Sequence, residues 1–277
     1  MSYGFEHVTV TYGDHDAVHA VSLRIAPGAV TALVGGDGAG KTTLLRAFAG
    51  RVEPSSGRVH RPPLHRVGVL TADPPGYGDL TVAQNLRFVA RVRGLSPRRA
   101  DERADALLAA TGLAGARDRL ADRLSGGMRR KLGIVLATLH EPEILLLDEP
   151  TTGVDPVSRT DLWRLMAGAA GAGTAVVFAT TYIDEAERCT QVLALDRGRV
   201  LAGGDPDRIM QPVRGQVYQA SAPGPAGRTW RRGAGWRVWM PVGVPDGAAA
   251  VEPDLEDAVV IAMLRRDAAP RHTAEVG

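Results

Sequence analysis

A glycine-rich loop between a strand-like run and a helix-like run constrains the fold of this chain more than any other feature. Residues 35–43 read GGDGAGKTT and fit the phosphate-loop pattern G-x-x-x-x-G-K-[ST]. The apolar run 29–34 (AVTALV) precedes the loop, and the helix-like run 42–49 (TTLLRAFA) follows it. In that order the loop opens a helix, whose free N–H groups and positive dipole end face a bound phosphate. A glycine-rich turn that ends in Lys-Thr by chance is the alternative, and the flanking runs argue against it. The sequence therefore predicts a nucleotide site.

The residue types in this loop suit phosphate binding. Glycine can adopt positive φ and lets the backbone approach a phosphate without a Cβ clash, which we expect at positions 35, 36, 38 and 40. Lys41 would place a positive charge beside the β- and γ-phosphates, and the Thr42 hydroxyl would be a ligand of Mg²⁺. The residues expected to contact the nucleotide here are Gly35, Gly36, Asp37, Gly38, Ala39, Gly40, Lys41, Thr42 and Thr43.

Composition narrows the classes of protein that this chain can be. Its 277 residues suit one large α/β domain with a small appendage, and 44% hydrophobic content is ordinary for a globular protein. A net charge of +2 and scattered arginines do not indicate a nucleic-acid partner. The single cysteine, Cys189, excludes an internal disulfide and suits a reducing compartment. The N-terminus lacks the features of a signal peptide, and the apolar runs are far shorter than the ~20 residues of a membrane span. We therefore expect another chain to cross the bilayer if the protein serves a membrane process.

The order of expected elements predicts an α/β fold, a P-loop NTPase with a mostly parallel sheet. Two N-terminal strands, at 3–10 and 17–25, form an antiparallel β region. Strands and helices then alternate, which favours a parallel sheet with helices on both faces. Residues 80–123 are helical by periodicity, open with a capping box at Thr81–Gln84, and form a helical subdomain. We expect strands at 66–70, 144–147, 174–179 and 192–195, and helices at about 98–110, 156–170 and 182–188.

The C-terminal part has a different composition. From about residue 212 Gly, Pro, Ala and Arg become frequent, with tryptophans at 230, 236 and 239. Residues 254–266 have the pattern of a capped amphipathic helix. Arginine interleaved with tryptophan can indicate single-stranded nucleic acid, but strand residues that pack against the main domain are the favoured interpretation. We therefore expect a main domain at 1–211 and a small accessory segment at 212–277.

A pair of acidic residues after the run 144–147 adds a candidate for catalysis. Asp148 lies at the C-terminal edge of the expected sheet, where ligands of doubly wound folds bind, and would hold Mg²⁺ directly or through water. Glu149 follows it and is placed to polarise an attacking water as general base. Two acids that merely cap a turn are the alternative, and the preceding phosphate loop makes it the weaker one.

The third motif identifies a family. Residues 124–128 read LSGGM at the start of an expected helix, so the Ser125 hydroxyl and the N–H groups of Gly126 and Gly127 can contact a phosphate. With the two preceding motifs, residues 3–211 resemble the nucleotide-binding subunits of ABC transporters, whose signature motif is LSGG. The resemblance implies two ATP molecules sandwiched between two such subunits, each signature motif contacting the γ-phosphate held by the other subunit.

The same resemblance supplies further expectations. Tyr12 matches the aromatic residue that stacks on adenine, and Asp155 matches the carboxylate of the loop that communicates between the two sites. The residues around Asp79 and 124–130 are most similar to subunits of drug- or polyketide-export type, whose permeases are separate polypeptides. The resemblance thus implies ATP and Mg²⁺, an integral-membrane permease subunit, a second ATP-binding subunit, no nucleic acid, and a peripheral location at the cytoplasmic face of the cell membrane.

Two positions depart from the family pattern. The family has a glutamine that contacts Mg²⁺ where this chain has Ala72, followed by Asp73, which could supply an oxygen ligand instead. The family also has a histidine at the γ-phosphate where this chain has Thr181. Threonine offers one neutral hydrogen bond, worth about 0.5–1.5 kcal/mol, but no acid–base chemistry. We therefore expect slow hydrolysis at this chain's own loop.

Three alternatives follow from these departures. The chain could belong to a heterodimer with one weak and one competent site, or to a homodimer that tolerates both substitutions. It could also be a regulatory subunit that binds ATP and completes its partner's site with little turnover of its own. A soluble ABC ATPase of translation or DNA repair is less favoured, because such proteins usually carry two domains or a long coiled-coil insertion. The cargo is not encoded in this chain, because the membrane subunit selects it.

Overall fold

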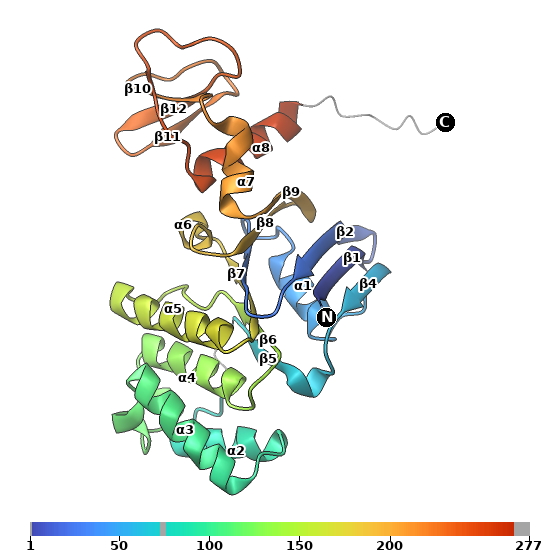
Figure 1. Ribbon diagram of the computed structural model, residues 1–277, viewed down its shortest axis with the longest axis vertical. Helices are drawn as coiled ribbons and strands as arrows, with labels where there is room; N and C mark the ends of the chain where they lie inside the picture. The colour runs from blue at the N-terminus through green and yellow to red at the C-terminus, as the bar shows by residue number, and fades with distance from the viewer. Residues whose placement is uncertain (1, 73–75, 269–277) are drawn as a thin grey trace.

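A six-stranded sheet forms the centre of the molecule in the computed structural model, which describes residues 2–72 and 76–268 (Figure 1). Neighbouring strands run parallel, except that β9 pairs antiparallel with β8 at one edge. In spatial order the strands are β5 (Val67–Leu70), β6 (Ile144–Asp148), β7 (Ala175–Thr180), β3 (Val30–Val34), β8 (Gln191–Asp196) and β9 (Arg199–Gly204). The expected α/β class with a mostly parallel sheet is confirmed.

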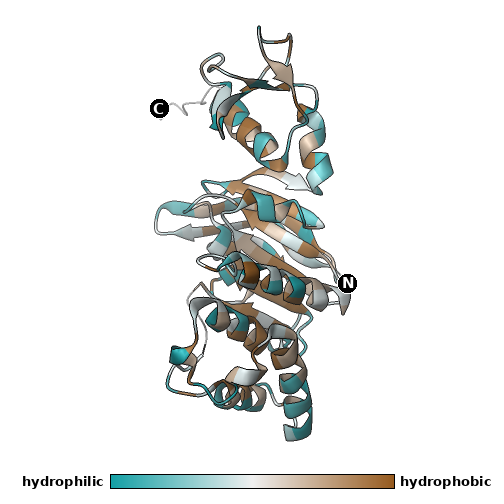
Figure 2. Ribbon diagram, turned by 90° about the vertical axis from the view of Figure 1, so that its left-hand side faces the viewer, coloured by the Kyte–Doolittle hydropathy of each residue, from teal (hydrophilic) through white to brown (hydrophobic). Residues whose placement is uncertain are grey.

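Both faces of the sheet are buried, and successive residues of each strand face opposite sides. In β6, Leu145 and Leu147 pack into one core cluster, and Ile144 and Leu146 pack into the other. The central strands are accordingly apolar along their length (Figure 2). Such continuous apolar runs are what a sheet covered on both faces requires.

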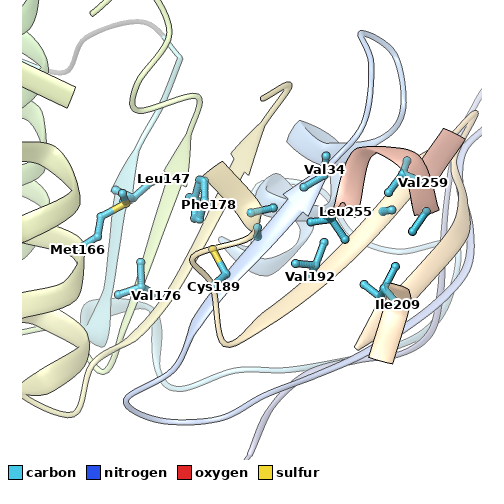
Figure 3. Packing of buried hydrophobic residues seen from close by; sticks show 14 of the residues in the cluster. Val34, Leu147, Met166, Val176, Phe178, Cys189, Val192, Ile209, Leu255 and Val259 are labelled. Carbon is cyan, nitrogen blue, oxygen red and sulfur yellow. The ribbon is translucent and has the colours of Figure 1, made fainter. Parts of the chain in front are cut away.

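Helices cover the two faces as the strand–helix alternation predicted. Helix α1 (Lys41–Phe48) packs on one face, and α5 (Pro156–Gly171) and α6 (Ile183–Ala186) cover the other. Figure 3 shows that the core on the α5 face continues from Met166 of α5, across Phe178 and Val192 of the sheet, to C-terminal residues such as Leu255. One apolar core therefore joins the sheet to the C-terminal helix.

An antiparallel sheet of three strands lies beside α1 (Figure 1). Its strands are β1 (Tyr3–Tyr12), β2 (His15–Ile25) and β4 (Ser56–His60). The first two were predicted, whereas β4 was not. At Gly57 a Cβ would lie 2.3 Å from the carbonyl oxygen of His7, so β4 can approach β1 only through a glycine.

The helical subdomain occupies the opposite end of the molecule from the C-terminal segment (Figure 1). The predicted capping box opens α2, because the Thr81 hydroxyl accepts the Gln84 N–H and the Gln84 side chain accepts the Thr81 N–H. The subdomain packs through its own apolar cluster onto α4, which contributes Leu132 and Leu139. The helices of this part are α2 (Val82–Val92), α3 (Pro97–Thr111) and α4 (Gly126–Thr138), with 3-10 turns at Ala114–Ala116 and Ala121–Arg123; a further 3-10 turn, Leu64–Arg66, precedes β5.

The C-terminal segment folds against the edge of the central sheet. Its four strands form a small antiparallel sheet in the order β11-β12-β10-β13, which agrees with the interpretation of the tryptophan-rich part as strand residues. Helix α8 buries Leu255, Ala258, Val259 and Ile261, as expected for an amphipathic helix, whereas Met263 is 36% exposed. The elements are α7 (Pro206–Met210), a 3-10 turn (Gln211–Val213), β10 (Val217–Ala220), β11 (Thr229–Arg232), β12 (Gly235–Trp239), β13 (Ala249–Ala250) and α8 (Leu255–Ala268). The division at residue 212 stays a prediction.

No helix in 2–72 or 76–268 has both the length and the apolar character that crossing a bilayer requires.

Candidate functional site

The phosphate loop connects β3 to α1 at the carboxyl edge of the parallel strands. Gly40 caps the helix with φ of 101°, and Gly38 has φ of 75°, as predicted for a tight glycine turn. The expectation of positive φ was wrong for Gly35 and Gly36. Gly35 is needed for space instead, because a Cβ there would lie 2.4 Å from the carbonyl oxygen of Leu195. The loop is therefore held by close backbone packing on β8 as well as by its turns.

The Lys41 side chain is buried and folds back over its own loop. Its ammonium group donates to the carbonyl oxygens of Gly35, at 2.7 Å, and Gly36, at 3.0 Å. Burial lowers the pKa of the Lys41 amine, and the negative charges of Glu149, Asp37 and Asp148 oppose that shift. An ammonium group at a helix N-terminus whose hydrogen bonds within the described residues go to carbonyl oxygens is well placed to bind an anion.

Two predicted magnesium ligands from distant parts of the sequence meet at the end of the loop. The Thr42 hydroxyl donates to Asp148 Oδ1 over 3.0 Å, and Asp148 is only 7% exposed. Burial raises the pKa of the Asp148 carboxyl, the neighbouring Glu149 raises it further, and the Thr42 hydrogen bond opposes this. A hydroxyl and a buried carboxylate together are oxygen donors of the kind that Mg²⁺ prefers, and a bound cation would offset the cost of the buried charge.

Glu149 occupies a strained turn directly after β6. Its φ of 49° is left-handed, which costs about 1–2 kcal/mol for a residue with a Cβ. Its N–H donates to the Ala179 carbonyl oxygen over 3.0 Å, which ties the turn to β7. Strain that the surrounding sheet maintains in this way is frequent at functional sites.

The remaining residues that the sequence predicts to contact the nucleotide lie in the loop or beside it. Tyr12 ends β1 with 48% of its surface exposed, opposite His15 in the hairpin. The hairpin touches the loop at Gly40, where a Cβ would lie 2.7 Å from the Ala17 carbonyl oxygen. Asp37 is exposed, Ala39 is buried and Thr43 is half-buried.

The two positions that depart from the family pattern also lie near the loop. Thr181 is exposed directly after β7, and Ala72 is exposed after β5. A cavity of about 400 Å³ is bordered by Ala72, Thr42 and Asp148, with Arg46 of α1 and Arg51, which follows that helix, on its wall. Asp73, the expected substitute ligand, lies outside the described residues.

The turn of the LSGG motif, residues 125–127 (the signature turn), lies away from the phosphate loop and contacts the start of α5. Ser125 is the N-cap of α4, where its hydroxyl accepts the Met128 N–H over 3.3 Å. Gly126 is open to space, whereas a Cβ at Gly127 would lie 2.8 Å from the Ser158 hydroxyl oxygen. The structure thus groups Lys41, Thr42, Asp148 and Glu149 at the loop, and Ser125–Gly127 with Asp155 and Ser158 at a second place.

Asp155 has a structural role that the sequence analysis did not state. It is the N-cap of α5, and its Oδ1 accepts the N–H groups of Ser158, at 2.9 Å, and Val157, at 3.1 Å. These bonds, that from Ser158 foremost, lower the pKa of the Asp155 carboxyl. The sequence carried the signal, because Asp followed by Pro is typical of a helix start.

Glu185 of α6 is a buried carboxylate that the sequence analysis missed. It is 3% exposed and accepts hydrogen bonds from the Thr151 and Thr180 hydroxyls, both at 2.9 Å. No sequence pattern reveals it, because an acidic residue in a short helix normally faces solvent.

Comparisons with known proteins agree with this geometry. The family model described as ABC transporter matches residues 18–152. The chain is 40% identical over 220 residues to the probable multidrug ABC transporter ATP-binding protein YbhF of Escherichia coli (strain K12), a match that covers 76% of this chain and 38% of that protein. The chain therefore spans well under half the length of YbhF.

Other relatives match over more of their own length. The daunorubicin resistance ATP-binding protein DrrA3 of Streptomyces coeruleorubidus is 38% identical, over 74% of this chain and 68% of that protein. The Nod factor export ATP-binding protein I of Cupriavidus metallidurans is 37% identical, over 74% and 71%. A solved structure described as the ATP binding subunit of an ABC transporter has a TM-score of 0.71 and 28% identity, over 76% of this chain and 93% of that chain. This chain belongs to the family of ABC transporter ATP-binding proteins.

Proposed function

We propose that this chain binds and hydrolyses ATP as the nucleotide-binding subunit of an exporter whose permease is a separate membrane protein. The observation that supports the proposal is the hydrogen bond between Thr42 and Asp148 close to Lys41, because MgATP binding needs oxygen donors for the metal and a cation for the phosphates. The names of the relatives, which refer to multidrug transport, daunorubicin resistance and Nod factor export, support an exporter.

The proposed near site uses the chain's own loop. The N–H groups of residues 35–43 and the Lys41 ammonium would bind the phosphates, and Tyr12 would stack on adenine. Thr42 and Asp148, with Asp73 as a third candidate, would hold Mg²⁺, which when bound neutralises the phosphate charge that develops during transfer. Glu149 would accept a proton from the attacking water.

The proposed far site is completed on a second ATP-binding subunit. Ser125, Gly126 and Gly127 would contact the γ-phosphate held by that subunit, and Asp155 would lie at the interface between the two sites. The close packing of Gly127 on Ser158 supports a shared role for the two segments, because it joins the signature turn to the start of α5, where Asp155 lies.

The permease is proposed to dock on the helical subdomain. Tyr77 and Phe88 form an edge-to-face pair at 5.0 Å, yet they are 52% and 43% exposed, and Val92 on the same helix as Phe88 is 68% exposed. An exposed aromatic pair with apolar neighbours fits a cytosolic helix of a membrane protein. This docking would hold the chain at the cytoplasmic face of the membrane.

The chain's own site is proposed to turn over slowly. Ala72 borders the cavity beside Thr42 and Asp148, but its methyl side chain offers no oxygen ligand, and Thr181 has no acid–base capacity near neutral pH. Ala72 and Thr181 favour a second candidate function, in which the chain is a regulatory subunit of a heterodimer and its partner carries the working site. Glu149 favours residual turnover.

ATPase assays on the complex with its permease test the proposal. We expect K41A to lose ATP binding at this site, and E149Q to bind ATP but to lower turnover at least about 10²-fold if this site is the working one. Unchanged turnover in E149Q assigns hydrolysis to the partner subunit. Turnover that ribosomes or DNA stimulate, without association with a permease, would overturn the exporter assignment.

A further inference from the structure

A buried polar connection links the turn after β6, the end of β7 and the first turn of α5. Its centre is Glu185, whose Oε2 accepts both the Thr151 hydroxyl, two residues after Glu149, and the Thr180 hydroxyl, one residue before Thr181. The Thr180 hydroxyl oxygen in turn accepts the Tyr182 N–H over 3.0 Å. One carboxylate oxygen thus fixes both loops that border the γ-phosphate end of the proposed near site.

The other oxygen of Glu185 faces Arg159 of α5. Arg159 Nε lies 3.7 Å from Glu185 Oε1, and neither atom makes a hydrogen bond within the described residues. The guanidinium group also lies over the Tyr182 ring, 5.0 Å from its centre. The backbone N–H of Arg159 donates to the Asp155 carbonyl oxygen in the first turn of α5. The ion pair therefore joins Glu185 to the helical turn that begins at Asp155.

Stability alone does not account for a charged pair at this place. Burial raises the pKa of the Glu185 carboxyl, so the ionised group is costly, and the Arg159 charge opposes that shift. Apolar residues of similar volume frequently stabilise a fold as much as a buried ion pair does, whereas breaking such a pair costs several kcal/mol. Here Glu185 is buried and Arg159 half-buried, and such a pair is useful where elements must keep one relative position, because its partners allow few other arrangements.

We propose that Glu185 is a positioning residue for ATP hydrolysis, which holds the Glu149 turn and the Thr181 loop fixed to α5 through Arg159. The proposal rests on the proposed function of the near site. Helix α5 also packs against Gly127 through Ser158. The contacts of Glu185 and Arg159 therefore also fix the position of the near site relative to residues 125–127 of the LSGG motif. Its loss lowers turnover and leaves ATP affinity nearly unchanged, because among the described residues the side-chain hydrogen bonds and the ion pair of Glu185 go to Thr151, Thr180 and Arg159 and not to the phosphate loop.

Hydrogen exchange on the ligand-free chain tests the positioning without any activity. In E185Q and R159Q, the amides of Glu149 and Tyr182 are expected to exchange at least about threefold faster, because the loops that carry them lose their fixed partner. Exchange in the α2–α3 region should not change. D184N is the matched control, because Asp184 is the exposed neighbour on the same helix. Unchanged exchange at Glu149 and Tyr182, or equal acceleration across the whole chain, overturns the proposal.

Kinetics of the complex with its permease supply the second arm. We expect E185Q and R159Q each to lower kcat about three- to tenfold with KM within about twofold, and the double variant to be no slower than the slower single one. Additive losses, or a raised KM with normal kcat, contradict the pairing. A wild-type complex that binds no ATP refutes the proposed function instead, while the exchange measurement still decides the role of Glu185 in the loops. Should E185Q fail to fold, R159Q and R159K decide the same question, because Arg159 is only half-buried and lysine keeps its charge.

Discussion

Replacement of Gly127 by alanine should destabilise the fold, although alanine normally favours a helix. The added Cβ would lie 2.8 Å from the Ser158 hydroxyl oxygen, 3.1 Å from the Ser158 Cβ and 3.3 Å from Asp155 Oδ2. Separations under about 3 Å force neighbours to move, and such overpacking typically costs about 1–3 kcal/mol. The gain from replacing glycine in a helix is about 0.5–1 kcal/mol. A net loss of about 1 kcal/mol, and at most about 2.5 kcal/mol, in the free energy of unfolding is therefore expected for G127A.

Gly126 supplies the control for this substitution. It lies one residue earlier in the same helix, but a Cβ there meets nothing within 4 Å. G126A should therefore be neutral or slightly stabilising. Equilibrium unfolding in urea measures both variants, with a shift in midpoint at constant slope as the criterion.

A second variant separates the clash from other causes. S158A removes the hydroxyl oxygen but leaves the Cβ contact at 3.1 Å, so G127A/S158A should recover about half of the loss relative to S158A alone. Equal midpoints for G126A and G127A would refute the reasoning, because the close packing of the signature turn on α5 would then carry no energy.

The other predictions concern single groups. D148N should raise the unfolding free energy of the ligand-free chain by about 1 kcal/mol at pH 7, because the raised pKa of Asp148 means that the folded state penalises the ionised carboxylate. The same variant should lose Mg²⁺-dependent ATP binding. Urea unfolding measures the first effect and calorimetry the second. Burial lowers the pKa of His140 to about 4, so the folded state favours the neutral ring, and stability should fall as pH drops from about 6.5 towards 4. In H140Q this acid loss should shrink by about 1–2 kcal/mol, after allowance for solvent screening, and an unchanged pH profile would contradict the assignment. T81A should cost about 1 kcal/mol, whereas T81S, which keeps the capping hydroxyl, should cost little in the same unfolding assay.

Local patterns were sufficient to predict most of the fold. Periodicity, caps and turn residues indicated the parallel strands and the main helices, because each strand alternates between two buried faces. The edge strand β9 and the short strand β4 were not predicted. Their residues are mostly exposed or half-buried, so pairing with β8 and β1 decides their structure and hydrophobicity gives no signal.

The candidate site divides in the same way. Lys41, Thr42 and Asp148 were predicted from motifs, and the contact between Thr42 and Asp148, 106 residues apart, agrees with the expected sheet edge. Glu185 and Arg159 were not predicted, because their pairing depends on how α5 and α6 pack and neither belongs to a local pattern. Groups that position a site through tertiary contacts need the structure to be recognised.

Binding of ATP to the purified chain, measured by calorimetry with and without Mg²⁺, tests the central claim most directly. The account predicts saturable binding by the wild type that weakens without Mg²⁺, and a loss of at least about tenfold in K41A, whose buried ammonium is the cation of the loop. Equal affinity in K41A and the wild type, or no binding by the wild type, would contradict it.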